Sequence, residues 1–419
     1  EQVELCAPCH SRRSELGDYD HRTPRLMANL LPAVLEEGLY HPDGQILDEV
    51  YVYGSFVQSK MFQNDVRCSD CHDVHSLKSV REGNDLCLQC HRADTYDSYD
   101  HHFHKKIHEG KPSDGALCVK CHMPEQAYMV IDERADHSLR VPRPDLSEKT
   151  GSPNACNTAD CHGDKSVAWS VEHYEKWYGI ARKPHYGTTL GAGRAGTPEA
   201  RDELIRLAGD TLYPAMVRAT ALSLLVNYPS PESTAAFARA LADEDPLVRY
   251  TAVGNVTAAS AEEYLELLAP LLFDPVRSVR IQAASQIADA PDALLKPYQR
   301  EALDEALVEY EEAMSYSLDF AFGGYNLGNL YARLGDGGKA EKFYRTAIGI
   351  DGLFVPARAN LAVLLNSMGR NEEAEEQLRA ALAAEPDAYE LAYSLGLLLG
   401  EMGQYEEAEQ YLAIAAEGM

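Results

Sequence analysis

The chain has 419 residues, of which 45% are hydrophobic, and its 66 acidic and 38 basic side chains give a formal net charge of −28. This length is sufficient for two or three domains, and so acidic a chain is a poor partner for nucleic acid or anionic membrane surfaces. No apolar run is long enough for a membrane-spanning helix. No signal peptide is visible and the first residue is Glu rather than Met, so we expect a mature or trimmed form.

Charge and cysteine content divide the chain into two regions. Residues 1–190 hold 30 acidic and 21 basic side chains, whereas residues 191–419 hold 36 and 17. All ten cysteines lie in the first region. The two regions are therefore expected to differ in structure and in role.

Four segments of the first region carry the pattern Cys-x-x-Cys-His. They are Cys6-Ala-Pro-Cys9-His10, Cys68-Ser-Asp-Cys71-His72, Cys87-Leu-Gln-Cys90-His91 and Cys118-Val-Lys-Cys121-His122. Two thiols at this spacing can reach the two vinyl groups on one edge of a haem, and the adjacent histidine can bind the iron. Zinc knuckles and disulfide frameworks also use cysteine pairs, but neither requires a histidine after each pair. The pattern predicts haem c at these four segments.

A fifth pair has a wider spacing, because four residues separate Cys156 from Cys161-His162. The two additional residues can bulge outward while both sulfur atoms still reach the haem. This stretch resembles the Cys-x4-Cys-His site of the tetrahaem cytochromes of sulfate-reducing bacteria. A local disulfide between the two cysteines is the alternative. With this segment, we expect five covalent haem c groups.

A second axial ligand for each iron is usually His or Met. Ten histidines remain after the five that follow cysteine pairs, and nine of the ten lie before residue 180. His75 is the best candidate because it lies three residues after His72. The other candidates are His41, His101, His102, His104 and His137, with His21, His108, His173, His185, Met123 and Met129 as weaker ones.

Residues 1 to about 180 resemble the multihaem cytochrome c proteins with paired haem motifs, which include bacterial cytochromes with tetratricopeptide repeats. The resemblance is carried by the stretches "CAPCHSRRSEL", "LYHPDGQILDEVYVYGSFVQSKMF", "CSDCHDVHSLK", "HHFHK", "CVKCHMPEQAYMVIDERADHSLRVPRPDL" and "SPNACNTADCH". It implies a loop-rich domain built around stacked porphyrins, and a role in electron transfer.

The segment 183–200 is rich in Gly, Thr and Pro and is expected to be a linker. A repeat of 31 residues follows, which aligns "AMVRATALSLL", "PLVRYTAVGNV" and "RSVRIQAASQI". Three columns coincide: Val217, Val248 and Val279; Arg218, Arg249 and Arg280; Ala221, Ala252 and Ala283. This region resembles short HEAT-like repeats of paired helices.

The last hundred residues repeat with a period of 34 and match the tetratricopeptide (TPR) pattern. Gly335, Gly369 and Gly403 are predicted to end the first helix of each repeat. Small residues recur where the helices are expected to cross, at Ala340, Ala374, Ala408, Ala347, Ala381 and Ala415. Such an array forms a solenoid with a concave groove, which is usually a docking surface.

The sequence thus predicts a mainly α fold, with a pentahaem cytochrome c domain at 1–182, a linker at 183–200, HEAT-like repeats at 201–312 and TPR repeats at 313–419. The expected function is electron transfer through five closely spaced haems with mostly two histidine ligands. The repeats would dock redox partner proteins or copies of the chain, and a homopolymer such as an extracellular cytochrome filament is one variant. A multihaem oxidoreductase acting on small nitrogen or sulfur compounds is the alternative. Because haem c is attached outside the cytoplasm, we expect a periplasmic or extracellular location.

Overall fold

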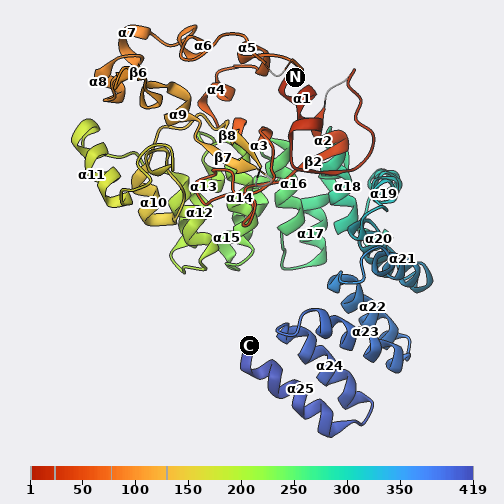
Figure 1. Cartoon of the computed structure of the whole chain (residues 1–419). Helices are drawn as coiled ribbons and strands as arrows, with labels where there is room; N and C mark the ends of the chain where they lie inside the picture. The colour runs from red at the N-terminus through yellow and green to blue at the C-terminus, as the bar shows by residue number, and fades with distance from the viewer. Residues whose placement is uncertain (1, 23–24, 77, 129–130, 419) are drawn as a thin grey trace. The chain divides into compact units, whose positions relative to one another are not determined.

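A computed structural model describes residues 2–22, 25–76, 78–128 and 131–418 of the chain (Figure 1). The described residues are mainly helical, as predicted, and their only sheets have two strands each. Contacts divide the chain into two compact units. One comprises Glu1–Ser14 and Tyr19–Ala259, and the other comprises Glu15–Asp18 and Ser260–Met419.

Helices in the cysteine-rich region are short, and α2 to α8 span four residues each. Isolated helices of this length are unstable in water, so surrounding contacts must hold them. The helical elements of the region are α1 (Gln2–His10), α2 (Leu26–Asn29), α3 (Tyr53–Phe56), α4 (Lys60–Gln63), α5 (Cys68–Cys71), α6 (Asp85–Leu88), α7 (Ala93–Tyr96), α8 (Tyr99–His102), η1 (Asp114–Ala116), α9 (Cys118–His122), α10 (Pro144–Thr150), η2 (Ala155–Asn157) and α11 (Val167–Tyr178).

Four hairpin-like sheets connect these helices. They pair β1 (Arg13–Glu15) with β2 (Leu30–Pro32), β3 (His72–Asp73) with β4 (Lys78–Ser79), β5 (Ile107–His108) with β6 (Lys111–Pro112), and β7 (Glu125–Tyr128) with β8 (Asp132–Ala135). In the last pair Glu125 lies opposite Ala135 in an antiparallel register. This hairpin delivers the Asp136-His137-Ser138 turn to the interior, where Asp136 and Ser138 are buried.

The apolar core of this region comes from residues 26–57, including the fully buried Leu35 and Tyr40. By contrast, no described residue of the segment 60–115 is buried; residue 77 lies outside the described part. A segment of this length without a core does not gain the free energy that offsets the entropy of ordering its chain.

The segment 183–200, expected to be a linker, contains helix α12 (Tyr186–Arg194). Leu190 is fully buried there, and α12 packs against α13 (Ala200–Gly209) and α14 (Ala215–Leu225). Arg194 donates hydrogen bonds to the carbonyl oxygens of Leu35 at 2.7 Å and Tyr40 at 2.8 Å. Glycine-rich composition suggested flexibility, but Gly193 allows close packing, because a Cβ atom there would lie 3.1 Å from Leu204.

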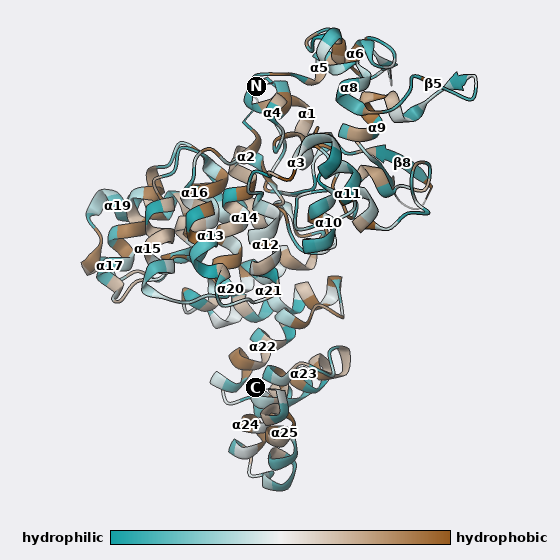
Figure 2. Cartoon of the chain, turned by 90° about the vertical axis from the view of Figure 1, so that its left-hand side faces the viewer, coloured by the Kyte–Doolittle hydropathy of each residue, from teal (hydrophilic) through white to brown (hydrophobic). Residues whose placement is uncertain are grey.

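The predicted 31-residue repeat forms helical pairs. Its helices are α14, α15 (Pro231–Ala240), α16 (Pro246–Asn255), α17 (Ala261–Leu268), η3 (Ala269–Phe273) and α18 (Arg277–Gln286). The aligned valines and alanines are all fully buried. In the aligned arginine column, Arg249 donates to the carbonyl oxygen of Asp243 and Arg280 to that of Asp274, both at 2.8 Å. Arg249 and Arg280 therefore tie α16 and α18 to the turns before them, whereas Arg218 of α14 pairs with the carboxylate of Asp243, which follows α15. Figure 2 shows hydrophobic stretches along these repeat helices.

The long helix α19 (Pro297–Tyr316), preceded by η4 (Asp292–Leu294), leads into three helical pairs. These are α20 (Ala321–Arg333) with α21 (Gly337–Ile350), α22 (Val355–Ser367) with α23 (Asn371–Ala384), and α24 (Tyr389–Glu401) with α25 (Tyr405–Gly418). Gly335, Gly369 and Gly403 follow the first helix of each pair with φ of 76°, 74° and 78°, as predicted. The six aligned alanines are buried. In the described part of the chain, no helix is long and apolar enough to cross a membrane.

Candidate functional site

The structure brings three histidines that follow cysteine pairs into contact with histidines predicted as second ligands. The ring centroids lie 6.2 Å apart for His72 and His137, 6.3 Å for His101 and His122, and 6.1 Å for His104 and His162. The first two pairs have near-parallel rings, with interplanar angles of 28° and 10°. Each pair therefore presents two imidazoles to a common space.

Backbone contacts fix the proton position in two of these rings. Nδ1 of His122 lies 2.7 Å from the carbonyl oxygen of Arg140, and Nδ1 of His137 lies 2.9 Å from that of Ala135. A carbonyl oxygen only accepts, so Nδ1 carries the proton and the lone pair remains on Nε2. Burial lowers the pKa of both side chains, which favours the neutral ring. A neutral ring with a free lone pair on Nε2 is the form of histidine that can coordinate a metal ion.

The remaining predicted histidines are placed less uniformly. Burial and then the charge of His75 lower the pKa of His10. The ring of His91 instead contacts Tyr96, with centroids 5.4 Å apart. His102 accepts a hydrogen bond at Nδ1 from the amide of His104, and no hydrogen bond reaches its buried Nε2 within the described residues. Met129, a weaker candidate, lies outside the described residues.

All ten cysteines are free thiols, including Cys156 and Cys161. Thiols of successive segments are neighbours. The thiol of Cys87 hydrogen-bonds to that of Cys118, which raises the pKa of Cys87 and lowers that of Cys118 to about 7. Burial and then the nearby Cys6 together raise the pKa of Cys68 to about 11. Cysteine segments that follow one another in the sequence are therefore also neighbours in space.

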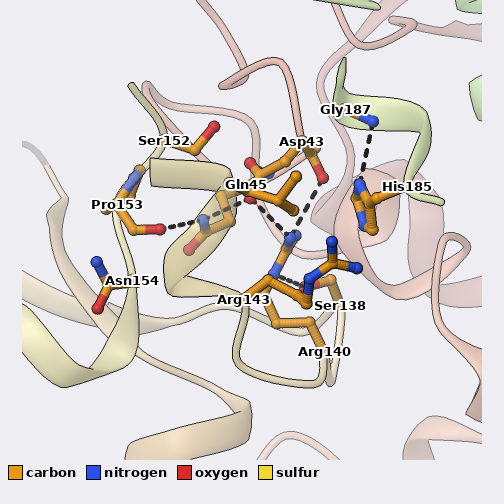
Figure 3. Close-up of polar contacts among 12 residues, drawn as sticks. Asp43, Gln45, Ser138, Arg140, Arg143, Ser152, Pro153, Asn154, His185 and Gly187 are labelled. Carbon is orange, nitrogen blue, oxygen red and sulfur yellow. Dashed lines mark hydrogen bonds and ion pairs between the residues drawn. The ribbon is translucent and has the colours of Figure 1, made fainter. Parts of the chain in front are cut away.

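A buried polar network surrounds Arg140, whose contacts with Asp43 and Ser138 are drawn in Figure 3. Nη1 of Arg140 lies 3.3 Å from a carboxylate oxygen of Asp43, and Nη2 lies 3.4 Å from Asp136. Nε of Arg140 donates to Ser138 at 2.9 Å. Because these charges are removed from water, each needs the others as partners. The network therefore holds the turn that carries His137.

His41 and His185 lie near Asp43 and Arg140 of this network and are not among the three histidine pairs. Burial lowers the pKa of His41, and the nearby Asp43 opposes that effect. Nδ1 of His185 accepts from the amide of Gly187 at 3.0 Å and caps α12. Burial lowers the pKa of His185 to about 4. His185 therefore caps α12 in this structure, and His41 lies near Asp43.

A second candidate site lies on the TPR helices. Val363 in α22 is 67% exposed, and Leu397 and Tyr393 in α24 are 48% and 42% exposed. Val363 and Leu397 are 34 residues apart, so they occupy the same position in neighbouring repeats. We call these three side chains the apolar stripe. We did not predict this exposed position from the sequence, although the alignment indicates it. The same column of the repeat alignment holds the polar Asn329, which is not expected at a core position.

Comparisons with known proteins identify the repeats. Residues 213–288 match the family of HEAT repeats. Residues 325–352, 355–387 and 389–415 each match the tetratricopeptide repeat family. Both predicted repeat types are confirmed. No curated protein matches the chain.

Similar solved structures are helical proteins of low sequence identity. Two crystal structures of MamA are 20% and 19% identical, with TM-scores of 0.27, and the matches cover 38% and 39% of this chain and 91% and 96% of theirs. A monomeric mutant of IFIT1 with Gppp-AAAA is 11% identical, with a TM-score of 0.33, and covers 58% of this chain and 64% of its own. Likeness at these TM-scores carries no inference about function.

These findings contradict the predicted function and the predicted haem cofactors. The families that match are HEAT and TPR repeats, not cytochromes. In the described residues, no group of three or more His, Cys, Asp or Glu side chains could hold a metal ion; the facing histidines form pairs. The predictions of electron transfer through five haem c groups, of a multihaem oxidoreductase and of an extracellular cytochrome filament are therefore wrong, and the comparisons show a chain that contains HEAT and TPR repeats.

Proposed function

We propose that this chain is a docking protein whose HEAT and TPR repeats bind partner proteins. The observation that carries the proposal is the apolar stripe, in which Val363 and Leu397 remain exposed at equivalent positions of adjacent repeats. Repeat solenoids expose extended surfaces of this kind for binding. Large apolar side chains that align across repeats favour a partner that covers them.

Charge indicates which partner the repeats would select. Residues 191–419 hold 17 basic and 36 acidic side chains, which gives 17 − 36 = −19. A partner with a basic rim around apolar anchor residues would complement this surface and associate faster at low salt. We propose a basic partner protein; copies of this chain, which would form a homopolymer, share the acidic charge and fit less well.

The experiment is affinity capture from the source cells with the full chain and quantitative mass spectrometry. The double variant Val363→Glu/Tyr393→Glu should lose a basic protein that the wild-type chain retains. The control variant Ile414→Glu changes another partly exposed apolar residue, 42% exposed in α25, and should retain it. If no protein is depleted selectively by the double variant, the stripe is not a docking surface.

We further infer that the cysteine-rich region binds a group through its thiols and imidazoles. Support comes from the three facing histidine pairs, from the fixed Nδ1 protons of His122 and His137, and from the absence of buried residues among the described residues of 60–115. The spacing of the cysteine segments, which resembles that of multihaem cytochromes c, supplies the residue assignment. The proposed binding residues are Cys6, Cys9, Cys68, Cys71, Cys87, Cys90, Cys118, Cys121, Cys156 and Cys161, with His10, His72, His91, His122, His162, His41, His75, His101, His102, His104 and His137.

Counting thiols tests this inference. The chain purified from its source would be unfolded, reduced and alkylated, and its intact mass measured. We expect fewer than ten alkylated cysteines and a mass above that of the polypeptide. Ten alkylated cysteines on a chain of the polypeptide mass would show that no group is attached.

A periplasmic or extracellular location and the boundary between HEAT-like repeats at 201–312 and TPR repeats at 313–419 also remain proposals. The location is supported by the resemblance of the cysteine segments to those of proteins whose cofactor is attached outside the cytoplasm. Cell fractionation with an antibody to the chain tests it. Detection in the cytoplasm alone would contradict it.

A further inference from the structure

Four residues from the start of the cysteine-rich region belong to the second compact unit. Contacts group Glu15–Asp18 with residues 260–419, whereas the chain up to Ser14 and from Tyr19 belongs to the first unit. We call Glu15–Asp18 the inserted segment. Its hydrogen bonds to α18 and to the end of α19 join residues that are 261 to 302 positions apart in the sequence. Proximity in the sequence therefore does not explain them.

Two side chains of the second unit hold the backbone of the inserted segment. Nη1 of Arg277, in α18, donates to the carbonyl oxygen of Leu16 at 2.9 Å. The hydroxyl of Ser317, which follows α19, donates to the carbonyl oxygen of Glu15. Arg277 also donates to the carbonyl oxygen of Glu309 in α19 at 2.9 Å, which fixes its guanidinium. Because every residue has a carbonyl oxygen, these two contacts can hold the backbone of another segment equally well.

Two side chains of the inserted segment add specificity. Leu16 is 6% exposed and is the segment's apolar anchor. Two residues later, a carboxylate oxygen of Asp18 accepts a hydrogen bond from the hydroxyl of Tyr316 at 2.9 Å. We call Arg277, Tyr316 and Ser317 the cradle. It holds a leucine, two carbonyl oxygens and an acceptor side chain in a fixed order.

The inserted segment is a weak ligand that its covalent attachment keeps in place. Leu16 is the only one of its four residues that is buried, and Asp18 is exposed. Contacts of this size between separate molecules are weak, but attachment within one chain gives an effective concentration of about a millimolar. A longer segment from another protein that makes the same contacts and buries more surface would therefore displace it. The hydroxyl of Ser317, which is 3% exposed, would then donate to a carbonyl oxygen of the incoming segment.

We propose that the cradle is a second docking site, which the inserted segment occupies until a partner protein supplies a segment with a Leu followed two residues later by Asp. This inference goes beyond the docking function proposed above, because no residue of the cradle belongs to the apolar stripe. The cradle uses Arg277 from the residues that match HEAT repeats, and Tyr316 and Ser317 from the stretch before the first TPR match at residue 325. Competition by the chain's own segment regulates the site.

The probe is a peptide with the sequence of residues 13–20, RSELGDYD. It is titrated to millimolar concentration into the fluorescently labelled full chain, and binding is followed by thermophoresis. The wild-type chain should bind it weakly, because its own segment fills the cradle. Leu16→Ser in the chain removes the apolar anchor and should strengthen peptide binding at least fivefold. Asp18→Ala, at an exposed position, removes one hydrogen bond and should strengthen it about twofold, which supplies the test if Leu16→Ser does not fold.

A change in the cradle makes the test specific. The chain with Leu16→Ser/Arg277→Ala should bind the peptide at least fivefold more weakly than the chain with Leu16→Ser alone. The matched control Leu16→Ser/Arg345→Ala changes an exposed arginine of α21 and should differ from Leu16→Ser less than twofold. A peptide that itself carries Leu16→Ser should not bind any of these chains.

Four results would overturn the proposal. They are equal affinities of the wild-type, Leu16→Ser and Asp18→Ala chains; no binding to any chain; binding that Arg277→Ala leaves unchanged; and binding to Leu16→Ser that Val363→Glu/Tyr393→Glu abolishes, which would place the peptide on the apolar stripe. Sedimentation adds a fifth, since wild-type dimers that Leu16→Ser converts to monomers would assign the inserted segment to a second copy. Failure of this test while the stripe variant still loses its captured protein would refute the cradle as a docking site and leave the proposed function standing.

Discussion

The segment 60–115 and the TPR helices of 321–418 are stabilised in different ways. The described residues of the first segment include no buried side chain, whereas each TPR repeat buries alanines and leucines at fixed positions. The repeats obtain their stability from side chains packed between helices. The cysteine-rich segment has to obtain it from elsewhere, and the region that surrounds it combines an apolar core at residues 26–57 with the buried polar network of Asp43, Asp136 and Arg140. The following changes test that contrast.

The largest effect is expected in the polar network. Arg140→Ala should lower the free energy of unfolding by about 4 kcal/mol, because it leaves the buried carboxylates of Asp43 and Asp136 without their cation. Urea unfolding followed by circular dichroism measures the change. The control Arg92→Ala breaks an exposed ion pair with Asp94 and should leave the free energy of unfolding nearly unchanged. Equal effects of the two substitutions would contradict the role given to the network.

The repeats should respond most to a change in apolar packing. Leu361→Ala in α22 removes a fully buried side chain and should cost about 3 kcal/mol by urea unfolding. Val363→Ala, two residues away on the same helix but 67% exposed, should change stability by less than about 0.5 kcal/mol. A large loss at Val363 would mean that the stripe is part of the core.

Acid should weaken the polar region through His185. Burial lowers its pKa from 6.5 in the unfolded chain to about 4 in the folded one, so the unfolded state binds more protons between these values. The stability that the neutral ring contributes is present above pH 6.5 and is lost as the pH falls toward 4. Between pH 7 and pH 4.5 this loss should be about 2 kcal/mol.

The measurement compares unfolding curves at the two pH values. His185→Gln should show a smaller acid-induced loss than the wild-type chain. The control His108→Gln, at an exposed position in β5, should behave like the wild type. An unchanged pH dependence in His185→Gln would show that other groups cause the acid sensitivity.

The smallest effect concerns a helix end. Gly369→Ala places a side chain at a residue with φ of 74° and should cost about 1 kcal/mol. Gly349→Ala lies inside α21 with no atom within 4 Å of the added Cβ, so it should be neutral or slightly stabilising. Thermal unfolding with the two variants side by side distinguishes the outcomes. A neutral Gly369→Ala would contradict the left-handed cap.

Sequence reasoning succeeded where one physical requirement recurs at a fixed interval. The alignment of Gly335, Gly369 and Gly403 predicted helix ends because each residue must adopt the same left-handed conformation. Val217, Val248 and Val279 were predicted as equivalent because each faces the same packing surface.

Where contacts are not periodic, the sequence was less informative. The composition of 183–200 predicted a linker, but Leu190 and Arg194 make it a packed helix through contacts with residues 35 and 40, far away in the sequence. The polar network likewise joins Asp43 to Arg140 across 97 residues, which no local pattern indicates. The cysteine spacing alone led to a predicted function that the comparisons replaced.

The contacts of Arg194 have a consequence for dividing the chain into fragments. Its guanidinium satisfies the carbonyl oxygens of Leu35 and Tyr40, while Leu190 fills the interior beside α13 and α14. A fragment that begins at residue 201 would expose the apolar surface that α12 covers, and one that ends at residue 182 would leave the two carbonyl oxygens without this donor. The cysteine-rich region and the first HEAT-like helices are therefore expected to unfold together as one unit.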